Sequence, residues 1–124
     1  MSVSEPKISI TETLFLTILE KGINSAVEQY KELKSSSGDK YNFKENQLNT
    51  LGYQLLQAGK TKEAIEILKL NIEAFPNSAN VYDSMGEAYM INGNKELARM
   101  NYEKSLEINP ANNNAIEMLG KLKK

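Results

Sequence analysis

A chain of 124 residues in which 40% are hydrophobic and 25% are charged has the composition of one ordinary globular domain. It contains no cysteine and no histidine, which excludes disulfide bonds, thiol nucleophiles, imidazole as a proton carrier and the usual zinc sites. Fifteen basic and sixteen acidic residues leave a net charge of -1 without a sustained basic run, so we expect no nucleic-acid partner, no cofactor and no metal.

The apolar stretches of the chain are too short to predict a membrane span or an export signal. The longest of them runs from Leu14 to Leu19, far short of the ~20 residues that cross a bilayer. Residues 1–9 lack the apolar core of a signal peptide. We therefore expect a soluble protein, located in the cytoplasm if the chain is full length.

The N-terminal third predicts a tail, a helix pair and a loop. Residues 1–8 are expected to form a disordered tail. Apolar residues at helical spacing predict helices over 9–20 and 24–34, with a glycine between them. The serine-rich stretch that follows, up to Phe43, has the composition of a loop. We interpret residues 9–43 as a degenerate helix pair with its loop.

A period of 34 residues organises the rest of the chain. It relates three apolar residue–glycine pairs, two further glycines and two prolines: Leu51-Gly52, Met85-Gly86 and Leu119-Gly120; Gly59 and Gly93; Pro76 and Pro110. A period of this length is typical of helical repeat proteins. Each period contains two stretches of helical spacing, separated by a glycine that can end a helix and closed by a proline that cannot continue one. We expect repeats over 44–77 and 78–111 and a single solvating helix over 112–124.

These residues resemble the tetratricopeptide repeat, whose pattern runs W-x2-L-G-x2-Y, then A-x3-F, then P. The second unit supplies Tyr82, Met85, Gly86, Tyr89, Ala98, Tyr102 and Pro110, and the first supplies Leu48, Leu51, Gly52, Leu55, Ala64, Leu68 and Pro76. Glycine and alanine mark the points where the two helices of a unit approach closely, Gly52 with Ala64 and Gly86 with Ala98. The resemblance implies an all-α fold, a stack of antiparallel helix hairpins with about seven helices that forms a right-handed α-α solenoid.

The resemblance also implies a binding surface, because in this family the first helices of successive repeats line a concave groove. Mapped onto this sequence, the groove contains these residues: Asn46, Asn49, Tyr53, Gln57, Asn80, Asp83, Ser84, Glu87, Met90, Asn114 and Lys121. Asn46, Asn80 and Asn114 recur once per repeat, and their amides either bind a peptide backbone or lie near the helix starts as caps. Tyr53 and Met90 either add an apolar strip to the groove or pack within the stack.

The charge of this groove indicates its partner. One subclass of the family holds the C-terminal carboxylate of chaperones with a clamp of lysine, asparagine and arginine. Here Asp83, Ser84 and Glu87 occupy the middle of the groove, so a carboxylate would meet negative charge. We expect the chain to be a protein- or peptide-binding scaffold whose partner is basic or neutral.

A structural or oligomerisation module is the alternative, because Met118 and Leu122 on the unfinished third repeat could pair two chains. We expect a monomer or a weak homodimer. Catalysis is not expected. Gly59-Lys60-Thr61 lacks the upstream glycine of a P-loop, and the S-x-x-K tetrads that begin at Ser4 and Ser37 lack the other motifs of serine hydrolases.

The stretch from Leu48 to Pro110 also resembles the repeat region that follows the catalytic domain in some bacterial serine hydrolases of the β-lactamase-related group. The helix pair at 9–43 and its serine-rich loop fit that arrangement. This resemblance implies an accessory module that packs on a catalytic domain, with a periplasmic location if the hydrolase is exported.

Overall fold

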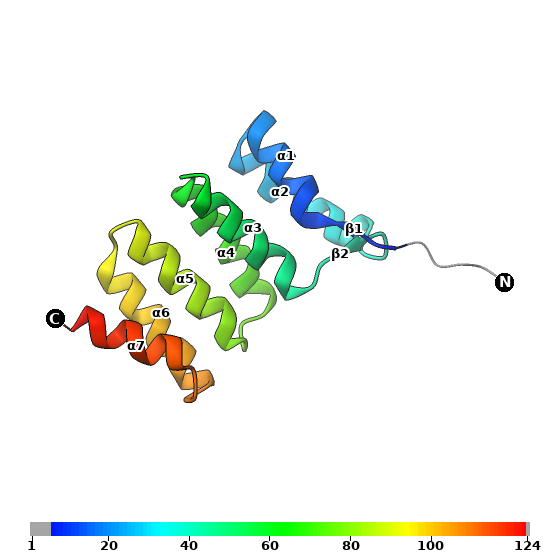
Figure 1. Ribbon diagram of the computed structural model, residues 1–124. Helices are drawn as coiled ribbons and strands as arrows, with labels where there is room; N and C mark the ends of the chain where they lie inside the picture. The colour runs from blue at the N-terminus through cyan, green and yellow to red at the C-terminus, as the bar shows by residue number, and fades with distance from the viewer. Residues whose placement is uncertain (1–5, 124) are drawn as a thin grey trace.

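A computed structural model describes residues 6–123, most of which are helical (Figure 1). Within these residues seven helices follow one another: α1 (Ile10–Lys21), α2 (Ile23–Ser36), α3 (Glu45–Gln57), α4 (Thr61–Ala74), α5 (Ala79–Ile91), α6 (Lys95–Ile108) and α7 (Asn113–Leu122). They form three hairpins, α1–α2, α3–α4 and α5–α6, with α7 packed on α6. The all-α stack of hairpins expected from the sequence is confirmed.

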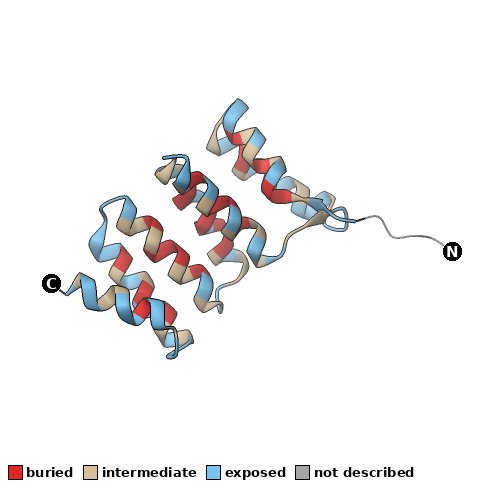
Figure 2. Cartoon of the chain, viewed as in Figure 1, coloured by how far each residue is buried: buried red, intermediate tan, exposed pale blue. Residues whose placement is uncertain are grey.

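The hairpins stack side by side, so that the helices form two layers (Figure 1). Helices α1, α3, α5 and α7 form one layer, which we call the A layer, and α2, α4 and α6 form the other. Figure 2 shows the buried residues on the sides of the helices that face other helices, with exposed residues on the outer surfaces. The core therefore runs along the whole stack, as expected of repeats that bury their apolar sides against their neighbours.

The turns inside the second and third hairpins are built alike, because each contains a glycine in the left-handed region. Gly59 has φ 77° and Gly93 has φ 85°, a conformation that costs glycine no steric strain. After each glycine the next amide turns back to the preceding helix. Lys60 N–H donates to the Leu55 carbonyl (2.8 Å), and Asn94 N–H donates to the Tyr89 carbonyl (2.9 Å).

Two large side chains pack onto glycines of the neighbouring helix and set the helix separation within the hairpins. A Cβ atom at Gly52 would lie 2.7 Å from Cδ2 of Leu68, and one at Gly86 would lie 2.8 Å from Cε1 of Tyr102. The close approach predicted from the small residues is present. It is the large residue four positions after Ala64 or Ala98, and not the alanine, that covers the glycine.

Polar side chains also tie the two helices of a hairpin together at the 34-residue period. Near the end of α4, Asn71 Nδ2 donates to the Glu45 carbonyl at the start of α3 (3.0 Å). One period later, Ser105 Oγ donates to the Ala79 carbonyl (2.7 Å). Each bond joins the second helix of a hairpin to the start of the first, so these buried polar residues serve the stack itself.

The N-terminal hairpin continues the stack through its contacts with α3. Thr11 Oγ1 donates to the Gln47 carbonyl (2.6 Å), and Ser9 Oγ donates to Gln47 Oε1 (3.0 Å). Leu14 and Ile18 join the same core cluster as residues of α3 and α4. The degenerate pair therefore packs as a further hairpin, despite the irregular spacing that separates it from the next one.

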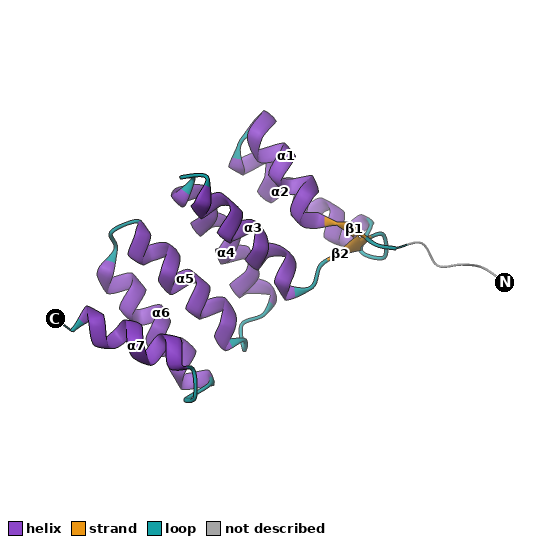
Figure 3. Cartoon of the chain, viewed as in Figure 1, coloured by secondary structure: helices purple, strands orange, loops and turns teal. Residues whose placement is uncertain are grey.

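One feature differs from the sequence-based expectation. Two short strands, β1 (Ile8–Ser9) and β2 (Tyr41–Asn42), pair in parallel where the sequence predicted a tail and a loop (Figure 3). The end of the expected tail, at Ile8, is thus ordered; residues 1–5 lie outside the described part of the chain. Ile8 N–H donates to the Lys40 carbonyl (2.9 Å), and the ring of Phe43 packs edge-on against Tyr30 at 5.6 Å between centroids.

Among the described residues, none of the helices has both the length and the apolar character needed to cross a membrane.

Candidate functional site

All residues of the predicted groove lie on α3, α5 and α7, which are successive helices of the A layer (Figure 1). Side chains that are 31 to 35 residues apart in the sequence therefore meet across the helix boundaries.

The boundary between α3 and α5 is bridged by Tyr53, whose hydroxyl donates to Glu87 Oε2 at 2.7 Å. Burial of the phenol raises the pKa of Tyr53 to about 12, and the neighbouring charge of Glu87 adds to the rise. Burial also raises the pKa of Tyr102, and the negative charges of Asp83 and Glu87 raise it further. Both tyrosines stay neutral at physiological pH, and Tyr53 orients the Glu87 carboxylate without cancelling its charge.

The boundary between α5 and α7 is bridged by Asp83. Asn114 Nδ2 donates to both carboxylate oxygens of Asp83, at 2.9 and 3.0 Å. Asn112 Nδ2 reaches the same carboxylate at 3.4 Å and donates to Ser105 Oγ at 2.8 Å. The donors are neutral amides, so Asp83 is fixed in place but keeps its negative charge.

Ser84 does not belong to an accessible surface, which corrects the sequence-based expectation. It is only 1% exposed, and its hydroxyl donates to Asn49 Oδ1 on α3. The physical reason is that Ser84 lies on the side of α5 that packs against α3, one residue away from the outward position of Asp83. Ser84 and Asn49 therefore join neighbouring repeats.

Met90 packs partly within the stack, in line with one of the two alternatives that the sequence left open. It is half-buried against the cluster of Ala98, Tyr102 and Ala115. The asparagines at the 34-residue period are also clarified. Asn46, Asn80 and Asn114 are exposed second residues of their helices, while the N-cap positions are taken by Lys44, Ser78 and Asn112. Gln57 and Lys121 are exposed as well.

The two carboxylates of α5 have no cationic partner within residues 6–123, in contrast to the six acidic residues that form ion pairs. In residues 6–123 the ion pairs join Lys60–Glu63, Lys69–Glu66, Arg99–Glu96, Arg99–Glu103, Lys104–Glu107 and Lys121–Glu117. Asp83 and Glu87 are absent from this set. The A layer therefore carries two negative charges at its centre that neutral donors orient.

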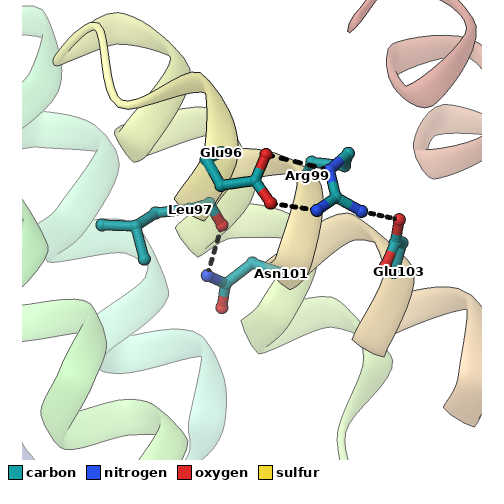
Figure 4. A network of polar contacts seen from close by, with 5 residues as sticks. All are labelled: Glu96, Leu97, Arg99, Asn101 and Glu103. Carbon is teal, nitrogen blue, oxygen red and sulfur yellow. Dashed lines mark hydrogen bonds and ion pairs between the residues drawn. The ribbon is translucent and has the colours of Figure 1, made fainter. Parts of the chain in front are cut away.

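Helix α6 shows the contrasting arrangement on its outer surface. Arg99 lies between Glu96 and Glu103 and donates to both, while Asn101 Nδ2 donates to the Leu97 carbonyl of the preceding turn (Figure 4). The hydrogen bond from Arg99 lowers the pKa of Glu96, and the two carboxylates raise the pKa of Arg99. Charges on this face are satisfied within one helix, as is typical of solvated helix surfaces.

A hollow between α1 and α3 was not predicted from the sequence. It has a volume of about 610 Å³ and is lined by Glu12, Phe15, Leu16, Gln54, Gln57 and Ala58. Leu16 is 58% exposed although it is large and apolar. The sequence held a signal for it, since Leu16 lies off the buried stripe of α1 that is formed by Ile10, Leu14 and Ile18. Gln57, a predicted groove residue, lies at the edge of this hollow.

Within the described part of the chain, no three acidic side chains come together in a group that could hold a metal ion.

Residues 79–112 match the family described as "Tetratricopeptide repeat". Over 59 residues the chain is 34% identical to human Superkiller complex protein 3, an alignment that covers 48% of this chain and 4% of that protein. The chain thus matches only a small part of a far longer relative.

Solved structures of tetratricopeptide-repeat domains share the fold. The second such domain of human RPAP3, in complex with an HSP70 peptide, has a TM-score of 0.65 at 21% identity, with 94% of this chain and 93% of that chain covered. The first such domain of Spaghetti (RPAP3), bound to an HSP90 peptide, has a TM-score of 0.63 at 18% identity, with 92% and 87% covered. The Sgt2 domain from Aspergillus fumigatus has a TM-score of 0.62 at 16% identity, with 96% and 83% covered.

At these identities the likeness establishes the fold. Residues 79–112, which include α5 and α6, match one unit of the tetratricopeptide-repeat family. Proteins of such repeats use their extended surfaces for binding.

Proposed function

We propose that the chain is a protein-binding scaffold whose A layer receives a basic or neutral segment of another protein. The observation that carries this proposal is the pair Asp83 and Glu87, which neutral donors hold in place without a cationic partner. Two structural neighbours were solved with peptides bound, which supports peptide binding as a use of this fold. Exposed amides of Asn46 and Asn80 would serve the partner's backbone.

The sign of the charge selects the partner. A cation that reaches one of these carboxylates at 4 Å gains about 1 kcal/mol in water and more where the site is partly shielded. A carboxylate brought to the same place is repelled by a similar amount. For this reason we expect basic segments to be preferred over the acidic termini that a lysine and arginine clamp would hold.

The hollow between α1 and α3 adds an apolar contribution at one end of the same layer. Phe15 and Leu16 offer uncovered apolar surface, and Glu12 stands at the rim with its carboxylate. A large aliphatic or aromatic side chain that fills the hollow would bury this surface, at about 25 cal/mol for each Å² removed from water. The preferred segment therefore combines lysine or arginine with a large apolar residue.

Charge-neutral substitutions test this proposal without changing side-chain size. Asp83→Asn with Glu87→Gln removes both charges from the A layer, and the matched control Glu66→Gln with Glu107→Gln removes two charges from exposed, paired positions of α4 and α6. The probe is a labelled synthetic peptide that carries lysines and leucines, followed by fluorescence anisotropy. Each carboxylate lost from the A layer should weaken binding by about twofold to fivefold, and added salt should reduce the difference.

The control pair should leave the affinity nearly unchanged. Equal losses in both double variants would mean that overall charge, and not the A layer, attracts the peptide. Binding that is unchanged by Asp83→Asn with Glu87→Gln would refute the role of the two carboxylates.

The narrower idea of a bacterial serine hydrolase whose catalytic domain packs on this module stays a prediction. It would make the partner a folded domain of the same protein. Co-purification of the chain with a separately expressed catalytic domain of that group would test it, and the absence of any complex at high micromolar concentration would count against it.

A further inference from the structure

The outer face of α7 is left open at a position that the two complete repeats cover. Leu68 lies over Gly52 and Tyr102 lies over Gly86, yet no atom lies within 4 Å of a Cβ built at Gly120. These three glycines follow one another at intervals of 34 residues. The surface above Gly120 is thus open to a third large side chain, and we call this position a seat. Within residues 6–123 no residue occupies it.

Beside that seat lies a side chain of the kind that would fill it. Ile116 precedes Gly120 by four residues, one turn of the helix, and is 50% exposed. Residues four apart lie on the same face of a helix. The face thus carries a large apolar side chain and an uncovered glycine, one turn apart.

A large apolar side chain and an uncovered glycine on one helix are complementary to a second copy of the same helix. When two α7 helices run antiparallel about a two-fold axis near Met118, each Ile116 comes to lie over the Gly120 of the other copy. Such an isologous contact uses the same surface twice and closes on itself. No other segment is needed to fill either seat.

The charges next to this face are self-complementary as well. Glu117 and Lys121 form an ion pair within α7 at 3.5 Å, and both remain largely exposed, at 67% and 62%. They follow Ile116 and Gly120 by one position each, so they flank the same face. In the antiparallel arrangement each Glu117 approaches the other copy's Lys121, which is the pattern that sets orientation in helix pairs.

Lys123 argues against a long covering helix of the kind seen inside the repeats. It occupies the position that Tyr89 holds one period earlier and Leu55 two periods earlier, where the second helix of the hairpin packs. A full-length helix would bury the ammonium group of Lys123 at a high cost. A short contact centred on Met118 leaves Lys123 at its edge, in water.

We propose that α7 is a self-association surface that joins two copies of the chain through Ile116 and Gly120, with Glu117 and Lys121 at its side. Helix α7 has 10 residues and is therefore about 15 Å long. Two such helices bury less area than the roughly 1,200 Å² of stable interfaces. The dimer is correspondingly weak, with a dissociation constant on the order of 0.1–1 mM.

Sedimentation velocity over a concentration series, from about 10 μM to 1 mM, measures this association. Ile116→Asp should raise the dissociation constant about tenfold or more, because it places two charges in apolar seats. Gly120→Leu covers the open position from within and should have the same effect, since a Cβ atom there meets no neighbouring atom within 4 Å. The control is Leu19→Asp, at a 53% exposed leucine on α1, at the opposite end of the stack (Figure 1).

A charge exchange distinguishes this contact from non-specific adhesion. Glu117→Lys and Lys121→Glu should each weaken self-association because like charges then face each other, whereas an equal mixture of the two variants should associate at least as well as the original chain. A wild-type chain that stays monomeric at 1 mM would overturn the proposal. So would Ile116→Asp and Gly120→Leu variants that associate like the Leu19→Asp control.

Discussion

The same substitution at equivalent positions of successive repeats should change stability in opposite directions. Glycine to alanine inside a helix gains up to about 1 kcal/mol, because glycine loses more backbone entropy on folding. At Gly120 the new methyl group meets no atom within 4 Å, so that gain should appear in full. At Gly86 it would lie 2.8–2.9 Å from three ring carbons of Tyr102, which is too close for any real contact.

The ring of Tyr102 has little freedom to move away, because it is fully buried between α5 and α7. Overpacking of a core costs about 1–3 kcal/mol. After subtraction of the gain in helix propensity, Gly86→Ala should destabilise the fold by about 1–2 kcal/mol. Gly52→Ala should lie in between, because its neighbour Leu68 is an aliphatic side chain that can change rotamer.

Urea unfolding followed by circular dichroism measures all three variants, at low micromolar protein so that association plays no part. The slope of free energy against urea should not change, since the surface exposed on unfolding is the same. Pairing Gly86→Ala with Tyr102→Leu should recover part of the loss through their coupling. Gly120→Ala that destabilises as much as Gly86→Ala would refute the claim that the third seat is open.

Two further predictions concern the pKa values of Tyr53 and Glu96. Glu87→Gln should lower the pKa of Tyr53 from about 12 toward its ordinary 10, as NMR titration of the labelled tyrosine ring would show; an unchanged value would mean that burial alone sets it. Because the folded-state pKa of Tyr53 is raised, its contribution to stability is complete below pH 10 and is lost as pH rises from 10 to about 12. Arg99→Ala should raise the pKa of Glu96 toward the ordinary glutamate value, and an unaltered carboxyl titration would show that the contact with Arg99 is not formed in solution.

The sequence was sufficient to predict the stack because its period fixes several kinds of contact at once. The turn glycines Gly59 and Gly93 have the left-handed backbone that their position predicts. The helix-facing glycines Gly52 and Gly86 have the close neighbours expected of small residues. Such positions depend on local geometry that repeats with the chain.

The features that the sequence did not predict depend on contacts that do not recur from one repeat to the next. The pairing of Ile8 with Tyr41 involves two residues a side and leaves no periodic trace. Ser84 is buried because it lies on the side of α5 that faces α3, whereas Asp83, one residue earlier, lies on the outward side. The hollow beside Leu16 lies against α1, which departs from the period, so its only sequence signal is the position of Leu16 off the buried stripe of that helix.

The most direct test of the proposed function is to locate the bound peptide on the chain. Amide chemical shifts of the isotopically labelled protein, recorded during titration with the lysine- and leucine-containing peptide, report which residues sense it. We predict changes that concentrate on exposed and half-buried residues of α1, α3 and α5, around Leu16, Gln57, Asp83 and Glu87. Changes confined to the outer faces of α4 and α6, or spread evenly over all helices, would contradict a binding surface on the A layer.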